Sequence, residues 1–412
     1  MKRFTAVGMA TALAVAVGAV LPPAGADAGY TVRTGADFNL PLVAAGFPGV
    51  KTDAHSDSSV ELKTHLVELI NNTPPGAMIR VSLYGWDDWA NHADPSNPTP
   101  AVEAAIWRGV RVRILLDRDA KLGADFATIS TAIATSHNKK SFIRRCGDAG
   151  RRGCLGSAVN HSKYFLFSTV GSSKYVVVQG TGHITQNWGG TQWDAMATVA
   201  GRKALYDGYV KYFEDETANR PNPNYYRTVT DGKYKAYFFP KSGNAAYSTA
   251  DDPIYGVLSK VKCGGNTTRP SAAGHKTIVR IVTWQFTRTP LAKKLRSLAN
   301  SGCQIRVVTN VVDPSSGGMN AGVTSALKGV KGIQVREGNV GGSFYIHAKY
   351  LLVEGNYNGT PNSGTVWVGS PNLTYPALKK NDENILKVSD ASWHDQFRRN
   401  FDNIWTVSRK PW

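Results

Sequence analysis

One segment of the chain occurs twice, and this repeat constrains the fold to a duplicated architecture. Residues 160–167 (NHSKYFLF) align with residues 346–353 (IHAKYLLV), so each copy contains a His-x-Lys tripeptide. Further along, residues 180–185 (GTGHIT) align with residues 369–374 (GSPNLT), and an acidic residue stands nine positions after the last Thr of each. Because the same polar residue types recur in the same order, we expect two half-sites of a single catalytic centre.

The repeated polar residues are of the kinds that chemistry at a phosphodiester requires. They are His161, Lys163, Thr181, His183 and Asp194 in the first copy, and His347, Lys349, Ser370, Asn372 and Glu383 in the second. One His can attack phosphorus covalently, while the other protonates the leaving oxygen and later deprotonates water. Two Lys can hold the phosphate oxygens, and a carboxylate on the far ring nitrogen fixes the tautomer of each His. This set of residues needs no metal ion and no other cofactor.

The pattern resembles the phospholipase D superfamily, whose motif is His-x-Lys-x4-Asp followed by a Gly-[Ser/Thr]-x-Asn segment. The resemblance covers most of the mature chain and implies catalytic roles for the two His, the two Lys and the two acidic residues. It implies substrate binding by Thr181, His183, Ser370 and Asn372, and it implies that His161 is the nucleophile. The residues themselves leave the choice between His161 and His347 open.

Three positions depart from the family motif. Ser168 and Glu354 stand where the motif has Asp, and His183 stands where it has Asn. Glu keeps the negative charge and His can still donate a hydrogen bond, whereas Ser loses the charge. The departures leave the reaction type in place, but they also fit a catalytically weak or inactive protein that binds phosphate or lipid.

Strand and helix patterns are duplicated along with the motifs. A buried-strand pattern at residues 78–84 returns at 277–283, and each is followed by a helical pattern that ends near a glycine, Gly109 or Gly302. Strands that alternate with helices predict an α/β fold. We expect two similar halves, each a mixed sheet flanked by helices, related by a pseudo-twofold axis with one active site at their interface.

The chain is expected to divide into a signal peptide at residues 1–28, a first half at 29–218, a linker at 219–231 and a second half at 232–412. A basic start, an apolar run rich in Ala and Val, and small residues before the expected cleavage point are typical of a secretory signal. The apolar run is short for a membrane span. We therefore expect the mature protein to be soluble and secreted.

The four cysteines are consistent with an oxidising compartment. Three pairings are possible. We expect disulfides Cys146–Cys154 and Cys263–Cys303, one within each half, because the first pair closes a short loop. Zinc binding is the less favoured alternative, since the cysteines lack a CxxC spacing and no His stands at a zinc-finger interval.

The net charge of +18, from 48 Lys and Arg against 30 Asp and Glu, attracts the protein to anionic surfaces. We expect a secreted phosphodiesterase of phospholipase D type that acts at a phospholipid membrane surface or micelle. It would hydrolyse glycerophospholipid head groups, or transfer the phosphatidyl group to an alcohol, through a phosphohistidine. The alternative is a secreted, sequence-nonspecific nuclease of the same superfamily, because the charge suits nucleic acid equally well. A monomer suffices, since one chain supplies both half-sites.

Overall fold

The structure is a computed structural model that describes most of residues 26–412. The positions not described within this range are 43, 88–94, 137–139, 149, 186–187, 189, 243–247, 250, 311–317 and 339–343. The predicted signal peptide lies almost entirely outside the described residues.

The first half is built on a seven-stranded mixed sheet with the order β1-β10-β7-β6-β2-β4-β5. Its strands are β1 (Gly35–Phe38), β2 (Met78–Leu83), β4 (Arg111–Leu116), β5 (Phe142–Arg145), β6 (Lys163–Val170), β7 (Ser173–Gly180) and β10 (Ala195–Val199). Strands β2, β4 and β5 are parallel, and the remaining neighbours are antiparallel. The central strands β2, β6 and β7 are rich in apolar residues and mostly buried, as expected where both faces of a sheet are covered.

The second half repeats this order as β12-β20-β19-β18-β14-β15-β16, with β11 added beyond β12 and β13 paired to β18. Its strands are β11 (Arg227–Asp231), β12 (Tyr234–Phe238), β13 (Val261–Lys262), β14 (Ile278–Thr283), β15 (Gln304–Thr309), β16 (Ile333–Glu337), β18 (Tyr350–Tyr357), β19 (Thr360–Gly369) and β20 (Asn384–Ser389). Each step along this order has the same direction as its counterpart in the first sheet. The predicted fold of two similar mixed sheets is therefore confirmed.

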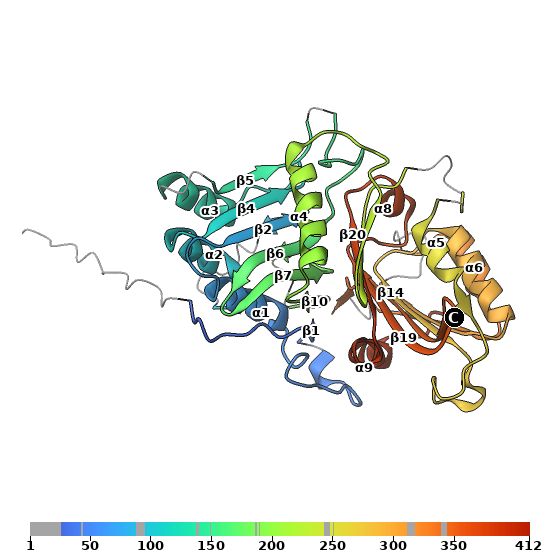
Figure 1. Cartoon of the computed structure of the whole chain (residues 1–412). Coiled ribbons are helices and arrows are strands. Elements are labelled where there is room, and N and C mark those ends of the chain that lie inside the picture. Colours follow the sequence, from blue (N-terminus) through green and yellow to red (C-terminus); the bar gives the residue numbers. More distant parts are fainter. Residues whose placement is uncertain are drawn as a thin grey trace, which may run out of the picture.

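Helices cover the outer face of each sheet, and two long helices lie where the halves meet (Figure 1). The outer helices are α1 (Glu61–Asn71), α2 (Pro98–Trp107) and α3 (Ala124–Thr135) in the first half, and α5 (Pro253–Leu258), α6 (Thr289–Asn300) and α7 (Ala321–Leu327) in the second. The shorter elements are β3 (Trp86–Asp87), β8 (Ile184–Thr185), β9 (Gln192–Trp193), β17 (Tyr345–Ile346) and α8 (Tyr375–Lys379). Gly109 and Gly302, just past α2 and α6, have φ angles of 89° and 94°, as expected at helix ends.

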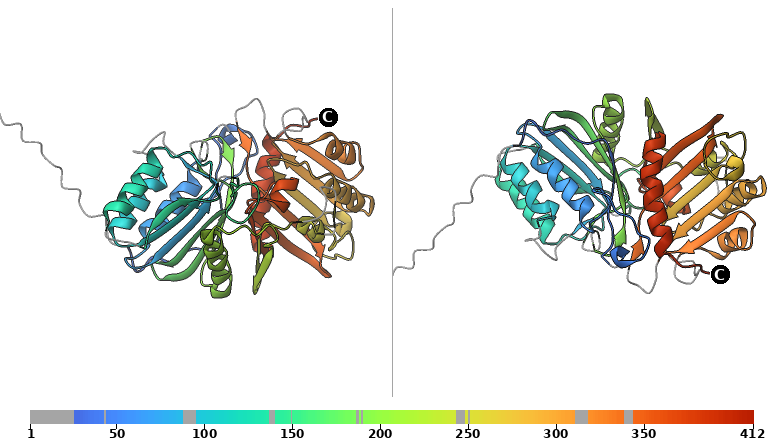
Figure 2. Two further views of the ribbon diagram at one scale, coloured as in Figure 1. Left: turned by 90° about the horizontal axis from the view of Figure 1, so that it is seen from above. Right: turned by 90° about the horizontal axis from the view of Figure 1, so that it is seen from below.

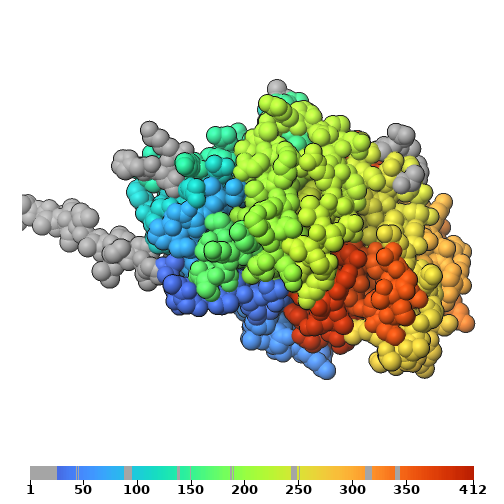
Figure 3. Space-filling view, viewed as in Figure 1, coloured from blue at the N-terminus to red at the C-terminus, as the bar shows by residue number. Residues whose placement is uncertain are grey.

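The two long helices tie the halves into one body. Helix α4 (Lys203–Ala218) contacts β7 of its own half and β12 of the other, and α9 (Ala391–Val407) contacts β19 of its own half and β1 of the other. Figure 2 shows each helix lying along the junction between the sheets. A single apolar core, which includes Tyr209, Phe213, Phe238, Phe397 and Phe401, runs through this junction. In the space-filling view, the segment around α4 lies across both halves (Figure 3).

The end of the predicted linker is part of the second sheet. Residues 227–231 form β11, which pairs with β12 in antiparallel fashion. Both predicted disulfides, Cys146–Cys154 and Cys263–Cys303, are present. Among the described helices, none combines the length and the apolar composition that crossing a bilayer requires.

Candidate active site

Two short parallel bridges join the halves at the His-x-Lys motifs. In one, Asn160, just before His161, pairs with Asp382, just before Glu383. In the other, Ile346, just before His347, pairs with Trp193, just before Asp194. These bridges place each His beside the carboxylate of the opposite half.

The side chains complete this crossed arrangement. The Nδ1 atom of His161 lies 3.0 Å from both carboxylate oxygens of Glu383. The Nδ1 atom of His347 lies 3.1 and 3.3 Å from the carboxylate oxygens of Asp194. A carboxylate can only accept, so each Nδ1 carries the proton and each Nε2 presents its lone pair. The predicted His and acidic residues are thus brought together, and neither half could orient its own His.

Neighbouring side chains hold the two carboxylates in place. The hydroxyl of Thr181 donates to Asp194 Oδ1 at 2.7 Å, and the side-chain amide of Asn381 donates to Glu383 Oε1 at 2.9 Å. The side chain of Asn39 accepts a hydrogen bond from the backbone N–H of Asp194. The sequence analysis assigned neither Asn39 nor Asn381 to the site, although Asn381 stands two residues before Glu383 as Gln192 stands before Asp194.

Both motif lysines are buried and lie close to the histidines. Lys163 Nζ donates to the backbone carbonyl of His161 at 2.9 Å, and Lys349 Nζ donates to the backbone carbonyl of Thr181 at 3.2 Å. Burial lowers the pKa of Lys349 to about 7, against the opposing charges of Asp194 and Glu383. Burial also holds the pKa of Lys163 well below its usual value, and the charge of Lys349 adds to the effect. A bound anion would offset the cost of burying either ammonium group.

The same burial keeps both histidines neutral at physiological pH. It lowers the pKa of His161 to about 4, opposed by Glu383 and reinforced by Lys163. It lowers the pKa of His347 to about 3, with Lys349 reinforcing the effect and Asp194 opposing it. A neutral His with a protonated Nδ1 has a nucleophilic Nε2, so either His is in the state that attack on phosphorus requires.

His183 lies between the two motif histidines. Its ring centroid is 5.1 Å from that of His161 and 5.9 Å from that of His347. Its Nδ1 accepts the backbone N–H of Tyr84 at 3.3 Å, which leaves the proton on Nε2 as a donor. In the other half, Asn372 Oδ1 accepts the backbone N–H of Gln285 at 3.4 Å. His183 and Asn372 therefore each accept a backbone N–H through one side-chain atom, and each keeps a side-chain N–H group that can donate to a substrate.

The hydroxyls of the predicted substrate-binding residues Thr181 and Ser370 are engaged within the protein. Besides donating to Asp194, the Thr181 oxygen accepts the backbone N–H of Ala195 at 2.9 Å. The Ser370 oxygen accepts the backbone N–H of Asn384 at 2.9 Å and lies 3.3 Å from its carbonyl oxygen. In this arrangement the two hydroxyls hold the backbone of Ala195 and Asn384, the residues that directly follow Asp194 and Glu383.

The two replaced motif Asp positions have structural partners away from the histidines. Ser168 accepts the backbone N–H of Met78 at 2.9 Å. Glu354 pairs with Arg280 at 2.8 Å and with Arg269 at 3.4 Å. These contacts join β6 to β2 and β18 to β14, so both residues hold neighbouring strands together.

Aromatic side chains from equivalent places in the two halves flank the histidines. Tyr84 directly follows β2, and its ring centroid is 6.2 Å from that of His161. Trp284 directly follows β14, and its ring centroid is 4.8 Å from that of His347. Arg152 donates to the Tyr84 hydroxyl at 3.1 Å and so adds a cation beside the site. The sequence analysis assigned neither Tyr84 nor Trp284 to the site, and the structure shows that each directly follows the equivalent strand of its half.

Two clusters among the described residues have ligand types that could hold a metal ion, and neither contains a predicted site residue. One combines Cys146 and Cys154 with Asp382, but its two sulfurs form a disulfide. The other combines Asp37, His55 and Glu61, where Asp37 is already paired with Arg33.

Comparison with known proteins supports the class that this fold and site define. Residues 272–405 match the family model described as "Cardiolipin synthase, PLD-like domain". Strands β14 to β20 and the motif with His347 and Lys349 lie within this match. Over these residues, the predicted resemblance to the phospholipase D superfamily is confirmed. No curated protein matches the chain in sequence.

Solved structures show the same fold over most of the chain. The phosphatidylserine synthase of Haemophilus influenzae is 14% identical, with a TM-score of 0.58, and the match covers 86% of each chain. The polyphosphate kinase of Porphyromonas gingivalis is 13% identical, with a TM-score of 0.51. That match covers 83% of this chain and 47% of the kinase, so the chain spans about half the length of that enzyme.

Proposed function

We propose that the protein is a secreted phosphodiesterase of phospholipase D type that acts on glycerophospholipids through a phosphohistidine. The observation that carries the proposal is the pair of crossed His–carboxylate contacts, His161 with Glu383 and His347 with Asp194. They surround a third imidazole and two buried lysines, and this set contains every group that two-step phosphoryl transfer needs.

In the first step, Nε2 of His161 attacks phosphorus and the bond to the head-group oxygen breaks. The leaving oxygen takes a proton from Nε2 of His347, which must first be doubly protonated. A bound phosphodiester anion favours that charge, because it opposes the burial and the Lys349 charge that hold the pKa of His347 low. Lys163 and Lys349 offset the charge on the phosphoryl oxygens, and the N–H groups of His183 and Asn372 supply further donors.

In the second step, His347 takes a proton from water, and the resulting nucleophile displaces His161 from phosphorus. The products are phosphatidic acid and free enzyme. An alcohol in place of water would give a new phosphatidyl ester by the same route, since the covalent intermediate accepts any nucleophile that enters. Glu383 and Asp194 keep both rings in the Nδ1–H tautomer throughout.

A lipid substrate is supported by the matching family description, which names the synthesis of cardiolipin, a phospholipid. Secretion is supported by the two disulfides, which suit an oxidising compartment, and by the signal-like start of the chain. The alternative is a secreted nuclease with the same mechanism. It is supported by the net charge of +18 and by exposed basic residues such as Arg144 and Arg145 on β5.

The test compares phosphatidylcholine micelles with plasmid DNA as substrates, in the presence of EDTA. The enzymes are wild type, His347→Ala and the control His55→Ala, whose side chain lies outside the site and is 44% exposed. Release of head group by wild type and the control, but not by His347→Ala, is the expected result. Cleavage of DNA alone, lost in His347→Ala, would assign the nuclease function, and undiminished lipid cleavage by His347→Ala would overturn the mechanism.

A further inference from the structure

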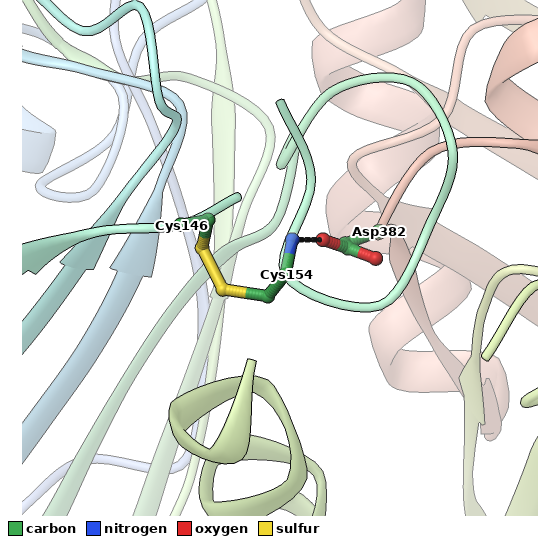
Figure 4. Close-up of side chains that lie close together, drawn as sticks. All are labelled: Cys146, Cys154 and Asp382. Atoms are coloured by element: carbon green, nitrogen blue, oxygen red, sulfur yellow. Dashed lines mark hydrogen bonds between the residues drawn. A yellow bond between two sulfur atoms is a disulfide. The ribbon is translucent and has the colours of Figure 1, made fainter. Parts of the chain in front are cut away.

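Asp382, the residue before Glu383, inserts a carboxylate from the second half into a loop of the first half. The loop is closed by the disulfide Cys146–Cys154. Figure 4 shows the Asp382 carboxylate beside the backbone N–H of Cys154. The Asp382 side chain is fully buried, and the sequence analysis gave it no role.

Three consecutive backbone amides bind this carboxylate. One oxygen accepts from the N–H of Gly156 at 2.6 Å and of Leu155 at 3.1 Å, and the other accepts from the N–H of Cys154 at 2.5 Å. Successive amides that converge on one acceptor form an anion-binding nest. The carboxylate is therefore matched to the loop in both charge and hydrogen-bonding capacity.

The approach of the two halves here is too close for side chains. A Cβ atom on Gly156 would lie 2.1 Å from the carbonyl oxygen of Lys380, and one on Gly153 would lie 2.9 Å from Asp382 Oδ2. Beside its hydrogen bonds to the Asp382 carboxylate, the loop thus meets the segment before Glu383 at backbone-to-backbone distance. Such a close contact fixes the position of that segment more tightly than contacts between flexible side chains would.

The backbone of Asp382 connects this nest to His161. Its N–H donates to the carbonyl of Val159 at 2.9 Å, and its carbonyl accepts the N–H of His161 at 2.9 Å. The next residue, Glu383, then meets the His161 ring. A shift of Asp382 would therefore move Glu383 relative to His161.

The equivalent place in the first half has a different residue. There, Trp193 precedes Asp194 and is buried within the apolar core that the halves share. Asp194 thus follows a residue that packs in the apolar core and is itself held by Thr181 and Asn39, whereas Glu383 follows a buried carboxylate bound in a nest. For this reason, a substitution of Asp382 should change the tautomer of His161 and leave that of His347 unchanged.

We propose that Asp382 is a positioning residue that, through the nest at residues 154–156, holds Glu383 against Nδ1 of His161 and so selects the tautomer of that histidine. The link to catalysis rests on the proposed function, but the link to the tautomer does not. The disulfide Cys146–Cys154 contributes to this positioning, because it closes the loop whose three backbone amides bind Asp382.

The test uses Asp382→Asn in the full chain, with Asp148→Asn as the control. Asp148 lies in the same disulfide loop, with its side chain 59% exposed. An Asn at 382 has the shape of Asp but must direct an NH2 group at an amide donor, whichever way it is turned. Nitrogen-15 NMR of labelled histidines reads the tautomers, with the His161 and His347 signals assigned from His161→Gln and His347→Gln.

The expected result is that His161 changes from the Nδ1–H tautomer to a mixture, while His347 keeps its wild-type signal. Head-group release should fall by about tenfold to a hundredfold in kcat, with KM nearly unchanged. The control should match wild type in both measurements. An unchanged His161 tautomer in a folded Asp382→Asn protein would overturn the proposal.

A second variant covers the case in which Asp382→Asn does not fold. Gly156→Ala adds a Cβ atom that prevents the close approach of residue 156 to the Lys380 carbonyl. It should therefore give the same mixture of His161 tautomers as Asp382→Asn. If both variants lose their cooperative thermal transition, the nest is a folding element and the positioning role is wrong. If wild type has no phosphodiesterase activity, the proposed function fails, while the tautomer measurement still decides the role of Asp382.

Discussion

At the scale of single residues, the ring of each motif His contacts a carboxylate from the other half. Replacing either carboxylate by its amide removes the acceptor that selects the Nδ1–H tautomer. By analogy with other His–carboxylate pairs, we expect Asp194→Asn and Glu383→Gln each to lower kcat about a thousandfold or more, with little change in thermal stability. The measurement is head-group release with phosphatidylcholine micelles. Near wild-type kcat in either variant would show that the crossed contacts do not control the histidines.

His183 tests whether the departure from the family motif preserves the site. Because Asn372 makes the equivalent contact in the other half, His183→Asn should keep kcat within about tenfold of wild type. His183→Leu removes the donor and should lower kcat by about a hundredfold, the usual loss for one transition-state donor. Equal loss in both variants would mean that the imidazole does more than donate one hydrogen bond.

The low pKa of Lys349 makes anion binding depend on pH. At pH 8 the free site holds Lys349 mostly neutral, because its pKa is about 7. A bound phosphate raises that pKa, so binding takes up protons, and affinity falls as pH rises above 7. Calorimetric titration with inorganic phosphate at pH 8, in two buffers of different ionisation enthalpy, measures the uptake. Lys349→Arg, which stays protonated, should take up fewer protons, and no uptake by wild type would contradict the assigned environment.

At the scale of secondary-structure elements, the sequence predicted the strands and helices that have a clear hydrophobic period or a counterpart in the other copy of the repeat. The strands β2, β6, β14 and β18, and the helices α2 and α6 that come after β2 and β14, follow from the pattern alone. Strand β11 (Arg227–Asp231) was assigned to the linker because residues 219–231 as a whole are rich in Asn, Pro and Tyr. The two-residue pairing of β9 with β17 is too short to show a period, yet it brings Asp194 to His347. The crossed contacts could not be predicted for the same reason, since the repeat identifies the residues but not which half meets which.

The two disulfides should differ in what they support. Cys263–Cys303 closes a 40-residue separation on the side of the second sheet away from the site. Loop-closure entropy predicts that replacing both cysteines by Ala lowers the free energy of unfolding by about 4 kcal/mol. Urea denaturation measures this loss, and KM and kcat below the transition should remain at wild-type values. A large change in kcat would show that the second half transmits strain to the site.

At the scale of the whole molecule, the halves share one apolar core, and their catalytic groups are interleaved across it. Duplication explains why the two sheets have the same strand order. The site itself forms only at the interface, because the His of each His-x-Lys motif contacts a carboxylate of the other half. The net charge of +18 over the whole chain is consistent with an anionic substrate surface and does not distinguish lipid from nucleic acid.

The most direct test of this account is to trap the covalent intermediate. In His347→Ala, attack on a lipid whose leaving group is p-nitrophenol needs no acid, while hydrolysis of the intermediate lacks its base. Mass spectrometry after rapid quenching should then find one phosphatidyl group per chain, attached to His161. An adduct on another residue, or p-nitrophenol release with no adduct at any time, would contradict a phosphohistidine formed at the junction of the two halves.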